Sequence, residues 1–95
     1  MEGPVRLEKK VVVSNKVGLH VRAASLFVDT AKKFASNIRV KTDEKEADGK
    51  SILDMLTLGA APGVSLLLIA EGEDAAQAIH SLEELVKARF HEKEE

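Results

Sequence analysis

The sequence contains no cysteine, tryptophan or tyrosine among its 95 residues, and its only aromatic side chains belong to three phenylalanines, at 27, 34 and 90. Without cysteine, the chain has no disulfides, no thiolate metal sites and no cysteine nucleophile. A nucleic-acid surface normally combines a basic patch with stacking aromatic side chains, so this composition argues against one. The hydrophobic core must therefore be aliphatic for the most part.

The sequence also lacks an excess of charge and a long apolar run. Fourteen Lys and Arg against sixteen Asp and Glu leave a formal net charge of -2. The longest apolar stretch, "VSLLLIA" at 64–70, is too short to span a bilayer, and the start "MEGPVRLEKK" lacks the apolar core of a signal peptide. We expect a cytoplasmic protein without membrane insertion or nucleic-acid binding. It forms one domain over 1–95, ordered over about 5–90, with a short acidic-basic tail "HEKEE".

The first half of the chain changes from a strand pattern to a helix pattern and back. "VRLEKKVVV" at 5–13 is rich in β-branched residues and predicts a strand. "NIRVKT" at 37–42 and "EKEA" at 44–47 predict two short strands joined by a tight turn. Between them, from residue 21, apolar residues recur at the spacing of one helix face. These residues are Ala24, Phe27, Val28, Ala31 and Ala35.

The second half predicts a short helix, a strand and a long helix. Ser51 followed by Asp54 resembles a capping box, in which the serine hydroxyl accepts from a backbone N–H, and "GAAPG" ends that helix. "VSLLLIAE" at 64–71 predicts a central strand buried on both faces. A long helix follows Gly72, where Glu73 and Asp74 suit the positive end of its dipole. The apolar positions of this helix are Ala75, Ala78, Ile79, Leu82, Leu85 and Val86.

The predicted order of elements is therefore β-α-β-β-α-β-α. Short strands combined with helices that are apolar on one side indicate a two-layer α/β open-faced sandwich. Its four-stranded sheet would be covered on one face by three helices. Periodicity alone does not fix the order of the strands in the sheet.

Local chemistry singles out His20, which stands at the start of the first predicted helix in "VGLHVRAAS" at 17–25. At a helix start, several backbone N–H groups lack an intrahelical partner and the dipole is positive. This environment disfavours protonation of the imidazole and stabilises an anion attached to it. Arg22 can add a charge-assisted contact to such an anion. The pattern suits a phosphoryl acceptor, although a lone histidine at this position is more often a cap or a surface residue.

Three stretches at matching separation resemble the HPr family, the histidine-containing phosphocarriers of the bacterial phosphoenolpyruvate-dependent phosphotransferase system. They are "GLHVRAA" at 18–24, "GKSILDMLTLGA" at 49–60 and "GEDAAQAIHSLEELV" at 72–86. The resemblance covers nearly the whole chain. It implies an antiparallel sheet in a β-α-β-β-α-β-α open-faced sandwich, which is the element order deduced from the sequence pattern.

The resemblance also implies roles for individual residues. It identifies His20 as the residue phosphorylated on Nδ1, Arg22 as the phosphate-stabilising residue and Ser51 as a regulatory phosphorylation site. It implies transient binding to enzyme I and enzyme IIA proteins, a serine kinase acting on Ser51, a monomer, and no cofactor. The protein would be a carrier rather than an independent catalyst. The expected partner-binding residues are Val21, Ser25, Ile52, Leu53 and Leu56.

The sequence departs from the commonest family pattern at two points. Arg-Ala-Ala at 22–24 replaces the usual Arg-Pro-Ala, and Val17 stands where a polar residue is frequent. Proline at a first-turn position favours the helix but takes no part in the chemistry. Because the Arg-Ala-Ala form resembles a nitrogen-related, regulatory branch, a regulatory output remains an alternative to sugar import.

Two further alternatives follow from His20 itself. It could be only a helix cap in a small α/β binding module. It could instead be the base of a small hydrolase with Ser25 nearby, but the sequence places no carboxylate to orient the ring. The other histidines, His80 and His91, lack carboxylates at ligand spacing, so we expect surface positions for both and no metal site.

Overall fold

The computed structural model describes residues 5–93, and their elements follow the predicted order. A single turn of 3-10 helix, η1, is the one addition to that order within these residues. The elements are β1 (Arg6–Val12), α1 (Val21–Ala31), β2 (Asn37–Lys41), β3 (Glu46–Asp48), α2 (Ile52–Leu58), β4 (Ser65–Glu71), α3 (Ala75–Lys87) and η1 (Arg89–His91).

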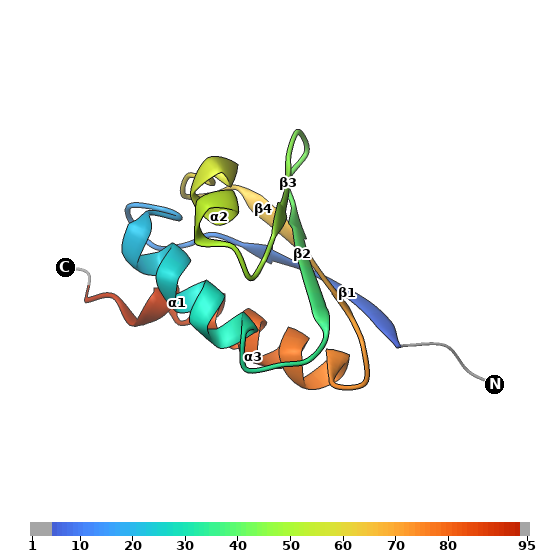
Figure 1. Cartoon of the computed structure of the whole chain (residues 1–95). Helices are drawn as coiled ribbons and strands as arrows, with labels where there is room; N and C mark the ends of the chain where they lie inside the picture. The colour runs from blue at the N-terminus through green and yellow to red at the C-terminus, as the bar shows by residue number, and fades with distance from the viewer. Residues whose placement is uncertain (1–4, 94–95) are drawn as a thin grey trace.

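The four strands form one antiparallel sheet in the order β1-β4-β2-β3. Since β1 and β2 both pair antiparallel with β4, they run in the same direction on either side of it. The connection between them must cross the sheet, and α1 lies in that connection. Figure 1 shows the helices together on one face of the sheet. The open-faced α/β sandwich predicted from the sequence is confirmed.

The core lies between this sheet and the helices. Leu66, Leu68 and Ala70 of the central strand β4 point toward the helices and are fully buried. All six predicted apolar positions of α3 are buried, and so are Phe27 and Phe90, which are the largest fully buried side chains. Burying one large aliphatic or aromatic side chain contributes about 1.5–3 kcal/mol. The core is mainly aliphatic, as the composition predicts.

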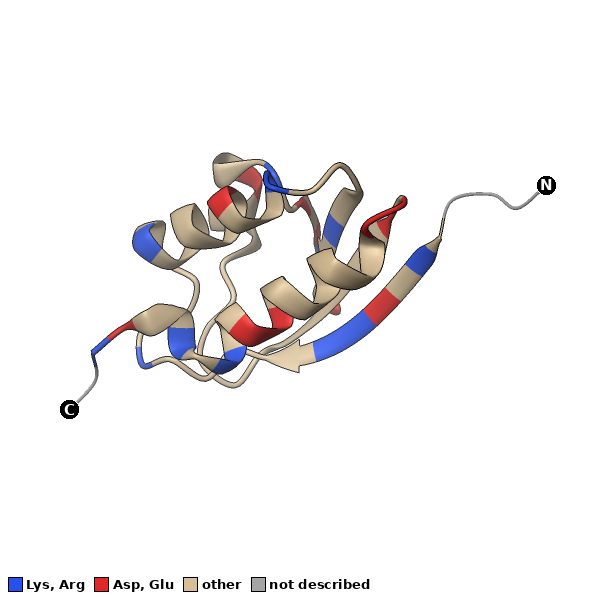
Figure 2. Ribbon diagram, turned by 90° about the horizontal axis from the view of Figure 1, so that it is seen from below, with Lys and Arg blue, Asp and Glu red and all other residues tan. Residues whose placement is uncertain are grey.

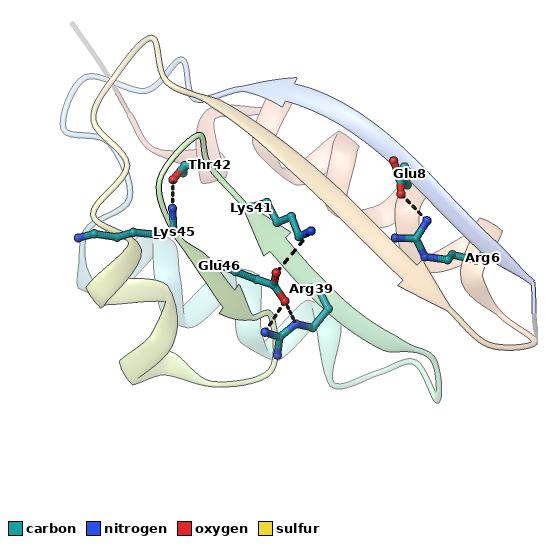
Figure 3. Close-up of polar contacts among 7 residues, drawn as sticks. All are labelled: Arg6, Glu8, Arg39, Lys41, Thr42, Lys45 and Glu46. Atoms are coloured by element: carbon teal, nitrogen blue, oxygen red, sulfur yellow. Dashed lines mark hydrogen bonds and ion pairs between the residues drawn. The ribbon is translucent and has the colours of Figure 1, made fainter.

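The open face of the sheet is covered by long charged side chains. Ile69 of β4 points to this face, yet it is only 5% exposed, and its neighbours in the sheet are Glu8 of β1 and Arg39 of β2. The methylene groups of such side chains cover apolar surface while their charged ends stay in water. Glu46 accepts a hydrogen bond of 2.7 Å from Arg39 Nε and forms an ion pair of 3.5 Å with Lys41 (Figure 3). Both acidic and basic residues occur along β1 (Figure 2), so the strand does not form a purely basic surface.

Helix α1 ends earlier than the predicted apolar face. It stops at Ala31, and Ala35 is exposed in the loop that leads to β2. Beyond the helix, the carboxylate of Asp74 accepts from the backbone N–H of Ala35 at 2.8 Å and from that of Ser36 at 2.9 Å. It also accepts from the Ser36 hydroxyl at 2.5 Å. We call this set, Asp74 with Ala35 and Ser36, the Asp74 clamp.

Asp74 lies at the positive end of α3, as the sequence predicts, and also forms the Asp74 clamp. Asp74 is the N-cap of α3, but its side chain makes no capping bond to that helix. The hydrogen bonds from the Ser36 hydroxyl and the Ala35 N–H lower the pKa of Asp74. Gly72 makes the close approach possible, since a Cβ there would lie 2.5 Å from Ser36 Oγ. The clamp thus ties the start of α3 to the loop after α1.

The strand β3 is shorter than predicted and begins at Glu46 rather than at residue 44. The turn before it is closed by the side chain of Thr42, whose Oγ1 accepts from the Lys45 N–H at 3.1 Å (Figure 3).

Within the described residues, no helix has the length and apolarity to cross a membrane, and no three His, Asp or Glu side chains are grouped to hold a metal ion.

Candidate functional site

His20 is the N-cap residue of α1. Its backbone is extended, with φ -93° and ψ -174°, and its carbonyl accepts the first helical hydrogen bond from Ala24 at 2.8 Å. The imidazole makes no capping bond to the helix, and the side chain is 37% exposed. The first backbone N–H groups of α1 therefore lack both intrahelical partners and a side-chain cap. The ring therefore lies at the positive end of a helix without capping it.

The loop before His20 is packed against the loop after α2. Leu19 N–H donates to the carbonyl of Ala60 at 2.8 Å. Gly18 has φ +72°, and a Cβ at this position would lie 2.6 Å from the same Ala60 oxygen. A side chain at residue 18 would therefore be strained and would collide with backbone. Because of this contact, the histidine loop and the end of α2 hold a fixed relative position.

The segment after α3 returns to this histidine. After α3, the segment passes through η1 and reaches the start of α1 (Figure 1). Glu92 Oε2 lies 2.5 Å from His20 Nε2 and 3.9 Å from Arg22 Nη1. Glu92 is 10% exposed, whereas Arg22 is 58% exposed. The expectation that no carboxylate orients the ring is thus wrong.

Asn15 holds the other oxygen of that carboxylate. Its Nδ2 donates to Glu92 Oε1 at 2.9 Å and to the carbonyl of Gly18 at 2.8 Å. Both partners are acceptors, so the amide nitrogen must face them. Asn15 is fully buried, and its Oδ1 has no hydrogen-bond partner within the described chain. A buried unpaired acceptor costs about 1–3 kcal/mol, so the two bonds of Nδ2 have to offset that cost.

Two structural features bring Glu92 to this place. Phe90 is fully buried and anchors the segment in the core. Arg89, Phe90 and His91 have φ values of 55°, 56° and 56°, which form a left-handed turn made of non-glycine residues. Single residues other than glycine seldom adopt this conformation, and three in succession are rarer still. The residue after this turn, Glu92, lies beside His20.

The carboxylate of Glu92 is held in its ionised form. Burial raises the pKa of Glu92, but the hydrogen bonds from Asn15 and His20, with attraction to His20 and Arg22, lower it by more. The net pKa lies below the ordinary value of 4.5. At neutral pH the site therefore contains a negative charge next to the imidazole.

Three large apolar side chains are exposed on α1 and α2, two helices that pack against each other. Val21, Ile52 and Leu53 are 63%, 41% and 73% exposed, as expected of partner-binding residues. Ser25 and Leu56 are half-buried, and Leu56 packs partly on the core. We call Val21, Ile52 and Leu53 the apolar patch. Large exposed aliphatic side chains on neighbouring helices are typical of a binding surface.

Ser51 is the N-cap of α2, as the sequence predicts. Its Oγ accepts from the Asp54 N–H at 3.2 Å, while the Asp54 carboxylate accepts from the Asp48 N–H at 3.0 Å. Only the serine half of a capping box is therefore formed. Met55 is fully buried, so this short helix turns Met55 into the core and leaves the apolar patch outside.

Sequence reasoning missed two residues of the site, Asn15 and Glu92. Asn15 lies in a polar loop with no pattern of its own, and Glu92 lies in a tail of alternating charge, 72 residues from His20. Their roles depend on long-range packing, for which the sequence offers no local signal. His80 and His91 are exposed, as predicted.

Comparisons with known proteins identify the family of this chain. The sequence model described as PTS HPr component phosphorylation site matches residues 7–88. Phosphocarrier protein HPr of Xylella fastidiosa is 40% identical over 86 residues, which cover 90% of this chain and 97% of the relative. Phosphocarrier protein NPr of Shewanella violacea is 37% identical over 87 residues, which cover 92% and 96% of the two chains.

A solved structure confirms the likeness at the level of the fold. The crystal structure of HPr-C-His from Thermoanaerobacter tengcongensis is 42% identical, has a TM-score of 0.88, and is matched over 93% of this chain and 99% of that chain. The fold and the site define a small α/β protein with a histidine at a helix start. The chain belongs to the HPr family, the phosphocarriers of the phosphotransferase system.

Proposed function

We propose that this chain accepts a phosphoryl group on His20 and passes it to a second protein. The observation that carries the proposal is the position of His20, half-exposed at the start of α1 with the first N–H groups of that helix uncapped. Those N–H groups and the helix dipole favour an anion attached to the ring. The exposed guanidinium of Arg22, two residues further on, supplies a positive charge for the phosphoryl oxygens.

The transfer itself needs positioning and charge stabilisation more than covalent assistance. We assign Nδ1 of His20 as the attacking atom, as in the family. Phosphorylated enzyme I would be the donor, and a histidine of an enzyme IIA protein the acceptor. The protein turns over stoichiometrically as a carrier in the cytoplasm and acts as a monomer.

The apolar patch is the proposed docking surface for both partners. Val21 is the first residue of α1, directly after His20, and Ile52 and Leu53 open the neighbouring helix α2. A partner seated there would have its own histidine close to His20. Since one surface must serve donor and acceptor in turn, the interface is small and transient. Ser25 and Leu56 would lie at its margin.

Ser51 is the proposed site of regulatory phosphorylation by a serine kinase. It precedes Ile52 and Leu53, so a phosphate on its Oγ would put a doubly charged group beside the apolar patch. Removing such a group from water against an apolar partner is costly, which would weaken docking. Whether the phosphoryl group serves sugar import or a regulatory output depends on the acceptor protein. The similarity to both HPr and NPr relatives keeps the regulatory alternative in place.

The test is incubation of the pure protein with enzyme I and phosphoenolpyruvate, followed by intact-mass measurement. We expect a mass increase of one phosphate that is lost in acid and stable in base. His20→Ala should abolish the increase while the fold is kept, and His80→Ala, which removes an exposed histidine of α3, should leave it unchanged. Unchanged labelling of His20→Ala would contradict the proposal.

A further inference from the structure

We propose that Glu92 is a positioning residue for phosphoryl transfer: its carboxylate holds the proton of the His20 ring on Nε2, so that Nδ1 keeps the lone pair that attacks phosphorus. The inference rests on the proposed function of His20. It extends that function to a residue of the C-terminal tail that neither composition nor periodicity distinguishes.

The first step of the argument is the identity of the contacting atoms. Glu92 Oε2 lies 2.5 Å from Nε2, and an ionised carboxylate can only accept hydrogen bonds. A neutral imidazole carries one N–H, so the contact requires that this hydrogen be on Nε2. The other nitrogen, Nδ1, then has a free lone pair. The carboxylate thus selects the tautomer that is competent at Nδ1.

The second step is that the carboxylate is itself fixed in place. Asn15 Nδ2 donates to Oε1 at 2.9 Å, and Glu92 is only 10% exposed. The backbone before Glu92 is held by hydrogen bonds from His91 N–H to Ala88 at 2.9 Å and from Glu92 N–H to Arg89 at 3.1 Å. The left-handed turn is anchored by the buried Phe90. A side chain held on both sides in this way restricts the rotation of the imidazole.

The third step concerns charge during the reaction. The Nδ1 lone pair forms the new N–P bond, and the bond between phosphorus and the donor histidine breaks with its electron pair left on the donor nitrogen. The proton on Nε2 stays in place, so the His20 ring becomes positively charged as the bond forms. Glu92 then faces a cation instead of a neutral ring, and the attraction is stronger in the transition state than before it. When His20 passes the group on, the same steps run in reverse.

The experiment compares Glu92→Ala and Glu92→Gln with wild type, using enzyme I and phosphoenolpyruvate as the phosphoryl source. Glu84→Gln, which neutralises an exposed carboxylate of α3, is the matched control. We expect Glu92→Ala to slow the labelling of His20 by about tenfold or more, the factor of a charge-assisted hydrogen bond. The amide oxygen of Glu92→Gln can still accept from Nε2–H. Its labelling rate should therefore lie between those of wild type and Glu92→Ala.

The second readout is the 15N NMR spectrum of the His20 ring, which reports the tautomer independently of transfer. Wild type should show a protonated Nε2 and an unprotonated Nδ1, and Glu92→Ala should show the two nitrogen shifts moving toward each other. A rate that is unchanged or faster in Glu92→Ala would overturn the proposal, and a faster rate would mean that Glu92 competes with phosphate for the site. If wild type takes up no phosphate at all, the proposed function fails instead, and the NMR readout still tests the contact.

Discussion

The two ends of the helical layer are each held by a carboxylate, but the two carboxylates bind different kinds of partner. At one end, which we call the clamp end, Asp74 binds the backbone N–H groups of Ala35 and Ser36 and the Ser36 hydroxyl. At the other, which we call the site end, Glu92 binds the imidazole of His20 and lies near the guanidinium of Arg22.

The difference between these partners teaches what each carboxylate is able to do. Backbone N–H groups and a serine hydroxyl stay uncharged at all ordinary pH values. The partners of Asp74 therefore do not change during function, and we expect the clamp end to contribute only to stability. An imidazole changes charge when it is protonated or phosphorylated, so the contact at the site end changes strength during function. Substitutions at the clamp end should therefore alter stability alone, and those at the site end should alter transfer.

The largest expected effect comes from Phe90→Ala, which removes the anchor of the site end. Phe90 is fully buried, and truncation of a buried phenylalanine costs about 3–5 kcal/mol. Chemical denaturation would measure this loss in the free energy of unfolding. Phe34→Ala, which truncates a half-buried phenylalanine packed at the edge of the core, is the control and should cost clearly less. Equal losses in the two variants would contradict the role of Phe90 as an anchor.

A second effect should appear only in transfer. Leu53→Glu puts a charge in the apolar patch, where docking would have to remove it from water, so labelling by enzyme I should slow by about tenfold or more. Because Leu53 is 73% exposed, its free energy of unfolding should change by less than about 0.5 kcal/mol. Val12→Glu changes a 51% exposed valine on β1 in the same way and should leave transfer unchanged. Slowing to the same extent by Val12→Glu would show that the apolar patch has no special role.

Ser51 allows stability and transfer to be separated within one residue. Ser51→Ala removes the cap of α2 and should cost about 1 kcal/mol, with transfer unaffected. Ser51→Asp keeps a capping oxygen and should retain the melting temperature, while its charge beside the apolar patch slows labelling of His20. The melting temperature and the labelling rate of both variants provide the comparison. An undiminished rate in Ser51→Asp would leave Ser51 as a helix cap only.

The smallest expected effect is the pH dependence of the clamp end. The hydrogen bonds from the Ser36 hydroxyl and the Ala35 N–H lower the pKa of Asp74 below its ordinary value of 3.8. The stabilisation is therefore complete above that value and is lost as the pH falls through the lower, folded-state pKa. Asp74→Asn should lower the melting temperature at pH 7, because the amide is uncharged and its nitrogen cannot accept where one of the two carboxylate oxygens did. The difference from wild type should shrink below pH of about 4.

Labelling of His20 should be the same in Asp74→Asn and wild type. A slower rate in this variant would mean that the two ends are coupled, and the comparison between them would no longer hold. A difference in melting temperature that stays constant down to the lowest pH would mean that the carboxylate charge is not what holds the clamp.

Local patterns in the sequence predict the elements well, because each pattern depends on near neighbours. The spacing of the apolar residues of α3, from Ala75 to Val86, predicts its buried face, and the pair Ser51 and Asp54 predicts the cap of α2. The order β1-β4-β2-β3 is not predicted, because alternation defines the faces of a strand but not its neighbours.

The parts of the structure that the sequence does not predict all involve contacts between distant segments. Ala35 fits the helical spacing of α1, but Asp74, 39 residues away, binds its N–H and holds it in a loop. Glu92 lies in a tail whose charge pattern resembles solvated surface, and a left-handed turn without glycine brings it to His20. The position of His20 is predictable because helix-start chemistry is local, whereas its partner is not.

The buried Phe90 fixes the position of the tail along the chain. The number of residues after Phe90 decides which side chain contacts His20. In this chain that side chain belongs to Glu92, the second residue after Phe90. Removal of His91 would bring Lys93 to that place and reverse the sign of the charge beside the ring, while one inserted residue would bring a second histidine there. The length of this short segment therefore carries information that its composition does not, and homologous tails should be compared by counting from the anchor rather than by matching letters.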